Sequence, residues 1–176
     1  MIRIALTFDQ LAALAPCDLL SRARLFPGPS TPLDARQAIA RGASIKDILW
    51  VAGKLRLGPQ IVAFAIAVAQ RVAHLDTTGS AQRCLDATVA YQKGPSPENL
   101  VVLKECRNAA AFAYAADAAA HAATSAYVAA HAAYAYVADV AAYAADAADA
   151  ATSSYDEREV QKVILLDIFA PLELAS

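Results

Sequence analysis

Cysteine is scarce in this chain, and its spacing is unsuited to cross-linking. The 176 residues include three cysteines, Cys17, Cys84 and Cys106, and no two of them are close in sequence. An odd number without a paired spacing argues against a disulfide framework and against a zinc site. We expect reduced, buried thiols that pack as small apolar side chains.

Glycine is also scarce, with six residues, and none of them builds a loop of the kind that cradles phosphate groups. The sequence likewise lacks a nucleophile elbow and a paired-cysteine motif. We therefore expect a protein that is not an enzyme and that binds neither a cofactor nor a metal ion.

Long runs of strongly apolar residues are missing, although 58% of the residues are hydrophobic. Alanine accounts for much of that fraction, with 26 of the 43 residues from Ala109 to Ala151. A membrane-spanning helix needs about 20 strongly apolar residues, and the strongest run, Ile61 to Ala69, is shorter. No signal-peptide pattern opens the chain. We expect a soluble cytoplasmic protein without membrane contact.

Charge is divided unevenly along the chain. Residues 1–107 carry 13 basic and 8 acidic side chains, a net charge of +5, whereas residues 108–176 carry 2 basic and 9 acidic side chains, a net charge of −7. Either the two parts compensate one another within the fold, or the acidic part faces a basic partner such as a nuclease. Basic and acidic residues alternate in the first part without an aromatic pattern, so a nucleic-acid partner is not expected.

Helix starts are easy to recognise. Thr7 with Gln10, and Ser44 with Asp47, have the spacing of a capping box. Thr31 followed by Pro32 predicts a third start, and Gly42 is placed to end that helix. Only residues 2–6 could form a short strand. The sequence predicts an all-α fold, a compact multi-helix bundle in which long Ala-rich helices pack closely.

The predicted core centres on residues 59–75, whose apolar side chains cover more than one face of a helix. Trp50 is expected to anchor the same core. Residues 155–169 form an amphipathic C-terminal helix that covers it. We divide the chain into a short N-terminal helical module, residues 1–30, and a helical bundle, residues 31–176, that includes the Ala-rich tract 98–153.

The Ala-rich tract must be helical because alanine is the best helix former and residues 98–153 contain neither glycine nor proline. At about 100° per residue, its polar side chains share about one third of the circumference. Tyrosines border this polar face, and the alanine side allows close approach of a neighbouring helix. The residues that we expect to bind a partner are Asp117, His121, His131, Asp139, Asp146 and Asp149, with Tyr127, Tyr134 and Tyr143 flanking them.

The length of this tract poses a geometric problem. A continuous helix of 43 residues would be about 65 Å long, whereas a compact domain of this size is about 40 Å across. Thr124 and Ser125 could cap a new helix. We favour a break there that produces a helical hairpin, although the shared polar face argues for continuity.

Three parts of this sequence resemble parts of known protein families. The first comprises the alanine repeats AAAFAYAADAAAHAA and AAYAYVADVAAYAADAADAA, followed by YDEREVQKVILLDIF. It resembles an Ala-rich immunity protein family of bacterial polymorphic toxin systems that also occurs in phage genomes. Upstream, IVAFAIAVAQRVAHL and QRCLDATVAYQKG look like the preceding helices of that family. The opening LTFDQLAALAPC resembles a short N-terminal module of bacterial and phage proteins. The resemblance implies neutralisation of a toxin and names no catalytic residue.

Three functional hypotheses follow. The first is a non-enzymatic inhibitor that binds a toxin or effector protein through the acidic, Tyr-flanked face. The second is a phage-encoded anti-defence protein that inhibits a host restriction or CRISPR-type enzyme. The third is a structural protein that self-associates through its alanine faces, with a homodimer as the simplest form.

Overall fold

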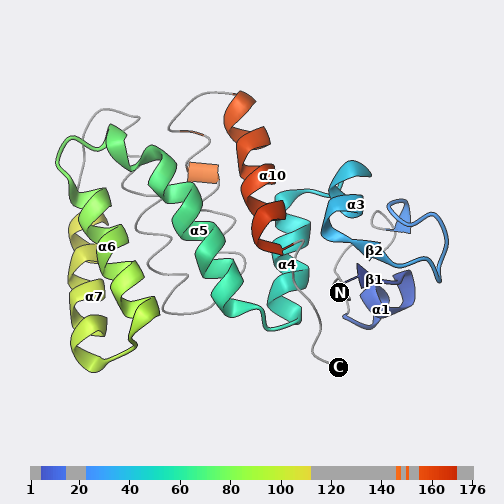
Figure 1. The fold of residues 1–176 in the computed structure, drawn as a ribbon, viewed down its shortest axis with the longest axis horizontal. Helices are drawn as coiled ribbons and strands as arrows, with labels where there is room; N and C mark the ends of the chain where they lie inside the picture. The colour runs from blue at the N-terminus through green and yellow to red at the C-terminus, as the bar shows by residue number, and fades with distance from the viewer. Residues whose placement is uncertain (1–4, 15–22, 112–145, 148–149, 151–154, 170–176) are drawn as a thin grey trace.

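The computed structural model describes residues 5–14, 23–111, 146–147, 150 and 155–169, and these residues form an all-α fold with one minimal sheet (Figure 1). The predicted hairpin break near Thr124 lies outside the described residues. The elements in chain order are β1 (Ala5–Leu6), α1 (Phe8–Ala13), β2 (Leu33–Asp34), α3 (Ala35–Ala40), α4 (Ile45–Lys54), α5 (Gly58–Val72), the 3-10 turn η1 (Ala73–Leu75), α6 (Ser80–Lys93), α7 (Pro97–Ala111) and α10 (Tyr155–Phe169).

Helix α5 occupies the middle of the molecule, as its sequence predicts. Its side chains from Ile61 to Val72 include seven that are fully buried, because α4, α6 and α10 each pack against a different side of it. Figure 1 shows the α6–α7 pair at one end of the molecule and α3 with the small sheet and α1 at the other. The main core therefore runs along α5.

Helix α10 covers this core, and its bounds agree with the predicted 155–169. Its buried side chains are four residues apart, namely Glu157, Gln161, Leu165 and Phe169. Two of these four are polar, whereas Val163 on the same helix is 57% exposed. The face of α10 that meets the core therefore includes polar side chains beside Leu165, Ile164 and Ile168, which pack there as an amphipathic helix predicts.

Capping boxes start α1, α3 and α4. Thr7 Oγ1 accepts from Gln10 N at 3.3 Å while Gln10 Oε1 accepts from Thr7 N at 2.9 Å. Ser44 and Asp47 form the same reciprocal pair at 3.1 and 3.0 Å. Each box satisfies backbone donors that a helix start otherwise leaves unpaired. Both predicted boxes are therefore confirmed.

The start predicted at Thr31 and Pro32 is wrong. Helix α3 begins at Ala35, and its cap is Asp34, whose Oδ1 accepts from Gln37 N at 2.8 Å. Residues Leu33 and Asp34 pair with β1 as an antiparallel strand, with Leu6 opposite Leu33. Because this pairing needs extended backbone, the helix cannot begin before Asp34. The pairing also joins β1 to a strand beyond residue 30, and the domain boundary at that residue remains a prediction.

Trp50 does not anchor the core as predicted. It is half-buried on α4, and Lys54 Nζ lies 5.4 Å from its ring centroid, within the range of a cation–π contact. The fully buried side chain of this helix is Leu49. A tryptophan one residue away from the buried position keeps its polar edge near the surface.

The cysteines that the structure describes are free thiols. Cys84 is fully buried on α6 and Cys106 is half-buried on α7. Cys84 therefore packs as a small apolar side chain, as expected. Cys17 lies outside the described residues.

Two helices end in the same hydrogen-bond pattern with different residues at its critical position. After α3, Ala43 N donates to Ala38 O and Gly42 N donates to Ile39 O; after α4, Leu57 N donates to Ala52 O and Arg56 N donates to Gly53 O. Both are Schellman motifs, which need a left-handed residue after the cap. Gly42 supplies it at φ 94°, whereas Arg56 adopts φ 59°.

Removing glycine from one motif and introducing it into the other should change the free energy of unfolding in opposite directions. Gly42→Ala should lower the free energy of unfolding by about 1 kcal/mol, because an L side chain is strained at positive φ. Arg56→Gly should raise the free energy of unfolding by up to about 1 kcal/mol, because glycine is not strained at positive φ. The greater freedom of glycine in the unfolded chain offsets part of this gain. Urea denaturation measures both.

Gly94→Ala is the matched control, because Gly94 ends α6 at φ −151°, where any residue fits. If Gly94→Ala lowers the free energy of unfolding as much as Gly42→Ala does, the explanation based on backbone conformation is contradicted.

The start of α6 depends on a buried carboxylate. Asp76 is 5% exposed, and its oxygens accept from Ala81 N at 2.7 Å, from Thr78 N at 2.9 Å and from Thr78 Oγ1 at 2.7 Å. Burial raises the pKa of this carboxyl, but the hydrogen bonds from Thr78, Ala81 and Ser80 outweigh burial and leave the pKa below its ordinary value of 3.8.

This lowered pKa predicts a pH-dependent contribution to stability. The ionised Asp76 should stabilise the fold at every pH above about 3.8, and this stabilisation should disappear as the pH falls through the lower pKa of the folded state. Asp76→Asn should lower the free energy of unfolding by about 1–2 kcal/mol at pH 7. Denaturation measured from pH 7 to pH 2.5 should show the difference between the two proteins shrinking; a constant difference would contradict the assignment.

Candidate functional site

Asp146 is the one predicted partner-binding residue that the structure describes. Its side chain is 63% exposed, so it faces solvent as predicted. The other residues proposed for this face lie outside the described residues, namely Asp117, His121, His131, Asp139, Asp149, Tyr127, Tyr134 and Tyr143.

Asp146 also has a partner within the chain. Arg158 Nη2 donates to Asp146 Oδ1 at 3.0 Å, which connects the end of the Ala-rich tract to the first half of α10. The Arg158 side chain is 33% exposed, so water screens this pair and its contribution to stability is small. An exposed carboxylate in a weak pair remains accessible to a stronger basic partner.

A different ion pair, between Arg71 and Glu157, joins the basic part of the chain to the acidic part, with its carboxylate buried and its arginine partly exposed. Glu157 is 3% exposed, and both of its oxygens accept from Arg71 Nε at 3.1 and 3.0 Å, with Arg71 Nη2 at 2.9 Å from Oε2. This geometry has the fork-like contact that makes arginine–carboxylate pairs strong. The pair secures α10 against α5 and shows that some of the opposite charge of the two parts is compensated inside the fold.

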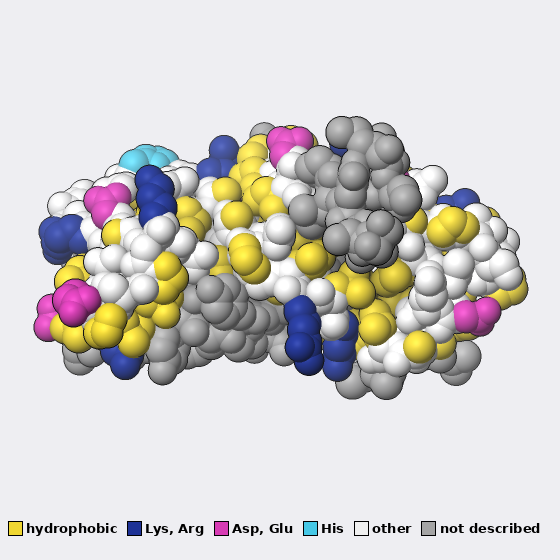
Figure 2. All heavy atoms as spheres, turned by 60° about the horizontal axis from the view of Figure 1, so that its bottom comes forward, with side chains coloured by type: hydrophobic (Ala, Val, Ile, Leu, Met, Phe, Trp, Pro, Cys, Tyr) yellow, Lys and Arg dark blue, Asp and Glu magenta, His cyan; other side chains and the backbone are white. Residues whose placement is uncertain are grey.

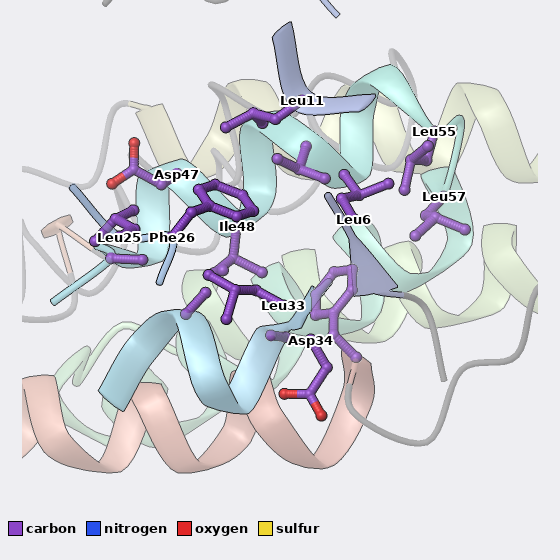
Figure 3. A pocket seen from close by; sticks show the side chains of 15 residues that line it. Leu6, Leu11, Leu25, Phe26, Leu33, Asp34, Asp47, Ile48, Leu55 and Leu57 are labelled. Carbon is purple, nitrogen blue, oxygen red and sulfur yellow. The ribbon is translucent and has the colours of Figure 1, made fainter. Parts of the chain in front are cut away.

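An apolar cavity of about 90 Å³ lies between the N-terminal elements, α3, α4 and the end of α10 (Figure 3). Residues of two hydrophobic clusters meet there: Leu25, Leu33 and Ala43 form a small second core, while Phe169 belongs to the main one. Ile48 packs against both clusters. The cavity therefore marks the junction at which the two cores are incompletely packed.

The cavity wall is almost entirely hydrocarbon. Among the lining residues that the structure describes, only Asp34 and Asp47 carry charge. Asp34 accepts from Gln37 N at 2.8 Å, and Asp47 Oδ2 accepts from Ser44 Oγ at 2.7 Å, so both carboxylates serve the capping boxes of α3 and α4. Figure 3 shows both carboxylates turned away from the middle of the cavity.

The described residues contain no group of three or more histidine, cysteine or acidic side chains placed to hold a metal ion. None of the helices that the structure describes has the length and apolar character needed to cross a membrane. Comparisons with family models, curated proteins and solved structures give no match to this chain.

Three features of this region escaped sequence reasoning. The capping box of Asp34 and Gln37 could have been found, because its spacing is the same as that of Thr7 and Gln10. The cavity could not, because its lining comes from residues 6 to 169. The pair of Arg71 and Glu157 spans 86 positions, and no local pattern indicates it.

The two kinds of ion pair on α10 should differ in their effect on stability. Arg71→Met should lower the free energy of unfolding by about 2–3 kcal/mol, because it leaves the buried carboxylate of Glu157 without its cation. This is below the range for fully buried pairs, since Arg71 is 41% exposed. Denaturant unfolding measures the loss.

Lys162→Met is the control on the same helix, where Lys162 and Glu159 form an exposed pair at 2.6 Å. It should change the free energy of unfolding by about 0.5 kcal/mol or less. Equal losses in the two variants would show that the burial of Glu157 does not matter.

Proposed function

We propose that this protein is a non-enzymatic inhibitor of the immunity type, which binds a basic toxin or effector protein through the acidic face of its Ala-rich tract. The observation that carries the proposal is the exposure of Asp146, whose carboxylate reaches solvent from a part of the chain, residues 108–176, with a net charge of −7. The resemblance of that part to immunity proteins supports the same role.

The electrostatics of such a complex follow from the position of the charge. Clustered carboxylates attract a basic partner over distances comparable to the Debye length, so they raise the association rate and fix the orientation of the partner. Arg158 lies beside Asp146, and a partner arginine that displaces it would form a pair less exposed to water. Inhibition of this kind needs only coverage of the partner's active site and no catalytic group.

The proposal is tested with the protein that the chain captures in stoichiometric amount from extracts of its source cell, purified in an inactive form; capture of no stoichiometric partner would count against the proposal. Asp146→Asn should weaken binding about tenfold, which corresponds to about 1.4 kcal/mol, and binding of the unaltered chain should weaken as salt increases. Isothermal titration calorimetry at two salt concentrations provides both results.

Asp86→Asn is the matched control, because Asp86 is also exposed and also accepts one side-chain hydrogen bond, from Gln82 at 2.8 Å, but lies on α6 in the basic part of the chain. Equal effects of the two substitutions, or binding that ignores salt, would count against the acidic face.

A further inference from the structure

The cavity at the junction of the two cores plays no part in the proposed function. Its lining comes from elements far apart in the sequence: the β1–β2 sheet, α1, α3, α4 and the last residue of α10. In Figure 2, hydrophobic side chains are also visible on the surface of this part of the molecule. The cavity is partly open to solvent, but because its wall is drawn from several elements, its shape is better defined than that of a shallow groove along a single helix.

The walls of the cavity are held in place by local backbone motifs. Asp34 and Asp47 belong to capping boxes, while Ala43 and Leu57 are the residues whose N–H groups close the two Schellman motifs. Each motif fixes backbone dihedral angles through its own hydrogen bonds. The walls therefore resist the inward collapse that usually reduces the volume of an empty apolar space.

The chemistry of the wall selects an uncharged ligand. No lysine, arginine or histidine is among the described lining residues, and the two carboxylates are occupied by their capping boxes and turn outward (Figure 3). Water in this partly open cavity finds few polar partners on the wall, so an apolar ligand displaces it at little cost. An engineered cavity of about 150 Å³ accepts benzene, so about 90 Å³ limits the ligand to at most a single small hydrocarbon ring.

We propose that this cavity is a binding site for a small, uncharged apolar molecule. Alanines at positions 35, 38 and 43 form part of the wall, and they leave open the space that a larger side chain could fill. A ligand in this position contacts both hydrophobic clusters at once and replaces the contacts that the wall atoms lack.

The first experiment uses benzene as the probe and the full chain in solution. Benzene at ten times its Kd should raise Tm by about 3–6 °C. In methyl NMR spectra, the signals of Leu33, Ile48 and Val51 should shift, while that of Leu85, buried on α6, should not. Benzoate and benzylammonium should produce neither effect, because their charges would lose hydration without gaining a partner.

A pair of variants on α3 separates a binding site from nonspecific contact. Ala38→Leu places a larger side chain in the cavity and should abolish the benzene-induced shifts at Ile48 and Val51. Ala40→Leu makes the same substitution at an exposed position two residues away and should leave them unchanged.

The proposal is overturned if benzene leaves the signals of Leu33, Ile48 and Val51 in place in the unaltered chain, which requires no variant to fold. It is equally overturned if Ala38→Leu folds and responds to benzene as Ala40→Leu does. Neither result bears on the toxin-binding proposal, because that experiment measures a protein complex through Asp146.

Discussion

The burial of α5 is the constraint on which the rest of the structure depends. A helix with apolar side chains around most of its circumference is stable in water only when other helices surround it. Helices α4 and α6, its neighbours in sequence, cover part of that circumference, and α10 covers another part from the far end of the chain. The fold must therefore bring residues 155–169 back to α5, although residues 112–154 separate α7 from α10 in the sequence.

The ion pair of Arg71 and Glu157 fixes the position of α10 along α5. Hydrophobic contact between α5 and α10 would tolerate a shift of one helix along the other, because apolar contacts have little directionality. A buried carboxylate tolerates no such shift, since displacement by one turn would leave it without its cation. Specificity here comes from a polar pair inside an apolar contact, and the large opposite charges of the two parts of the chain make such a pair available.

Sequence reasoning succeeded where the determining interactions are local. The capping boxes at Thr7 and Ser44, the glycine at position 42 and the bounds of α10 all depend on residues a few positions apart. It failed where distant pairing overrides local preference: the strand at Leu33 exists only because β1 lies beside it, and this pairing delays the start of α3 to Ala35, with Asp34 as its cap. Trp50 was misplaced because its size and hydrophobicity were weighed without its position: Ile45, Leu49 and Ala52 recur at helical spacing on the buried face of α4, and Trp50 lies about 100° from Leu49. For the candidate site, the sequence predicted the exposure of Asp146, whereas the cavity arises from packing between elements and has no sequence pattern.

Phe169 belongs to two environments at once, because it is buried in the main core as the last residue of α10 and also forms part of the cavity wall. Any molecule held in the cavity touches a side chain that must leave if α10 detaches from α5. Occupancy of the cavity and attachment of α10 are thus thermodynamically linked, and the linkage is reciprocal: whatever favours one favours the other by the same free energy.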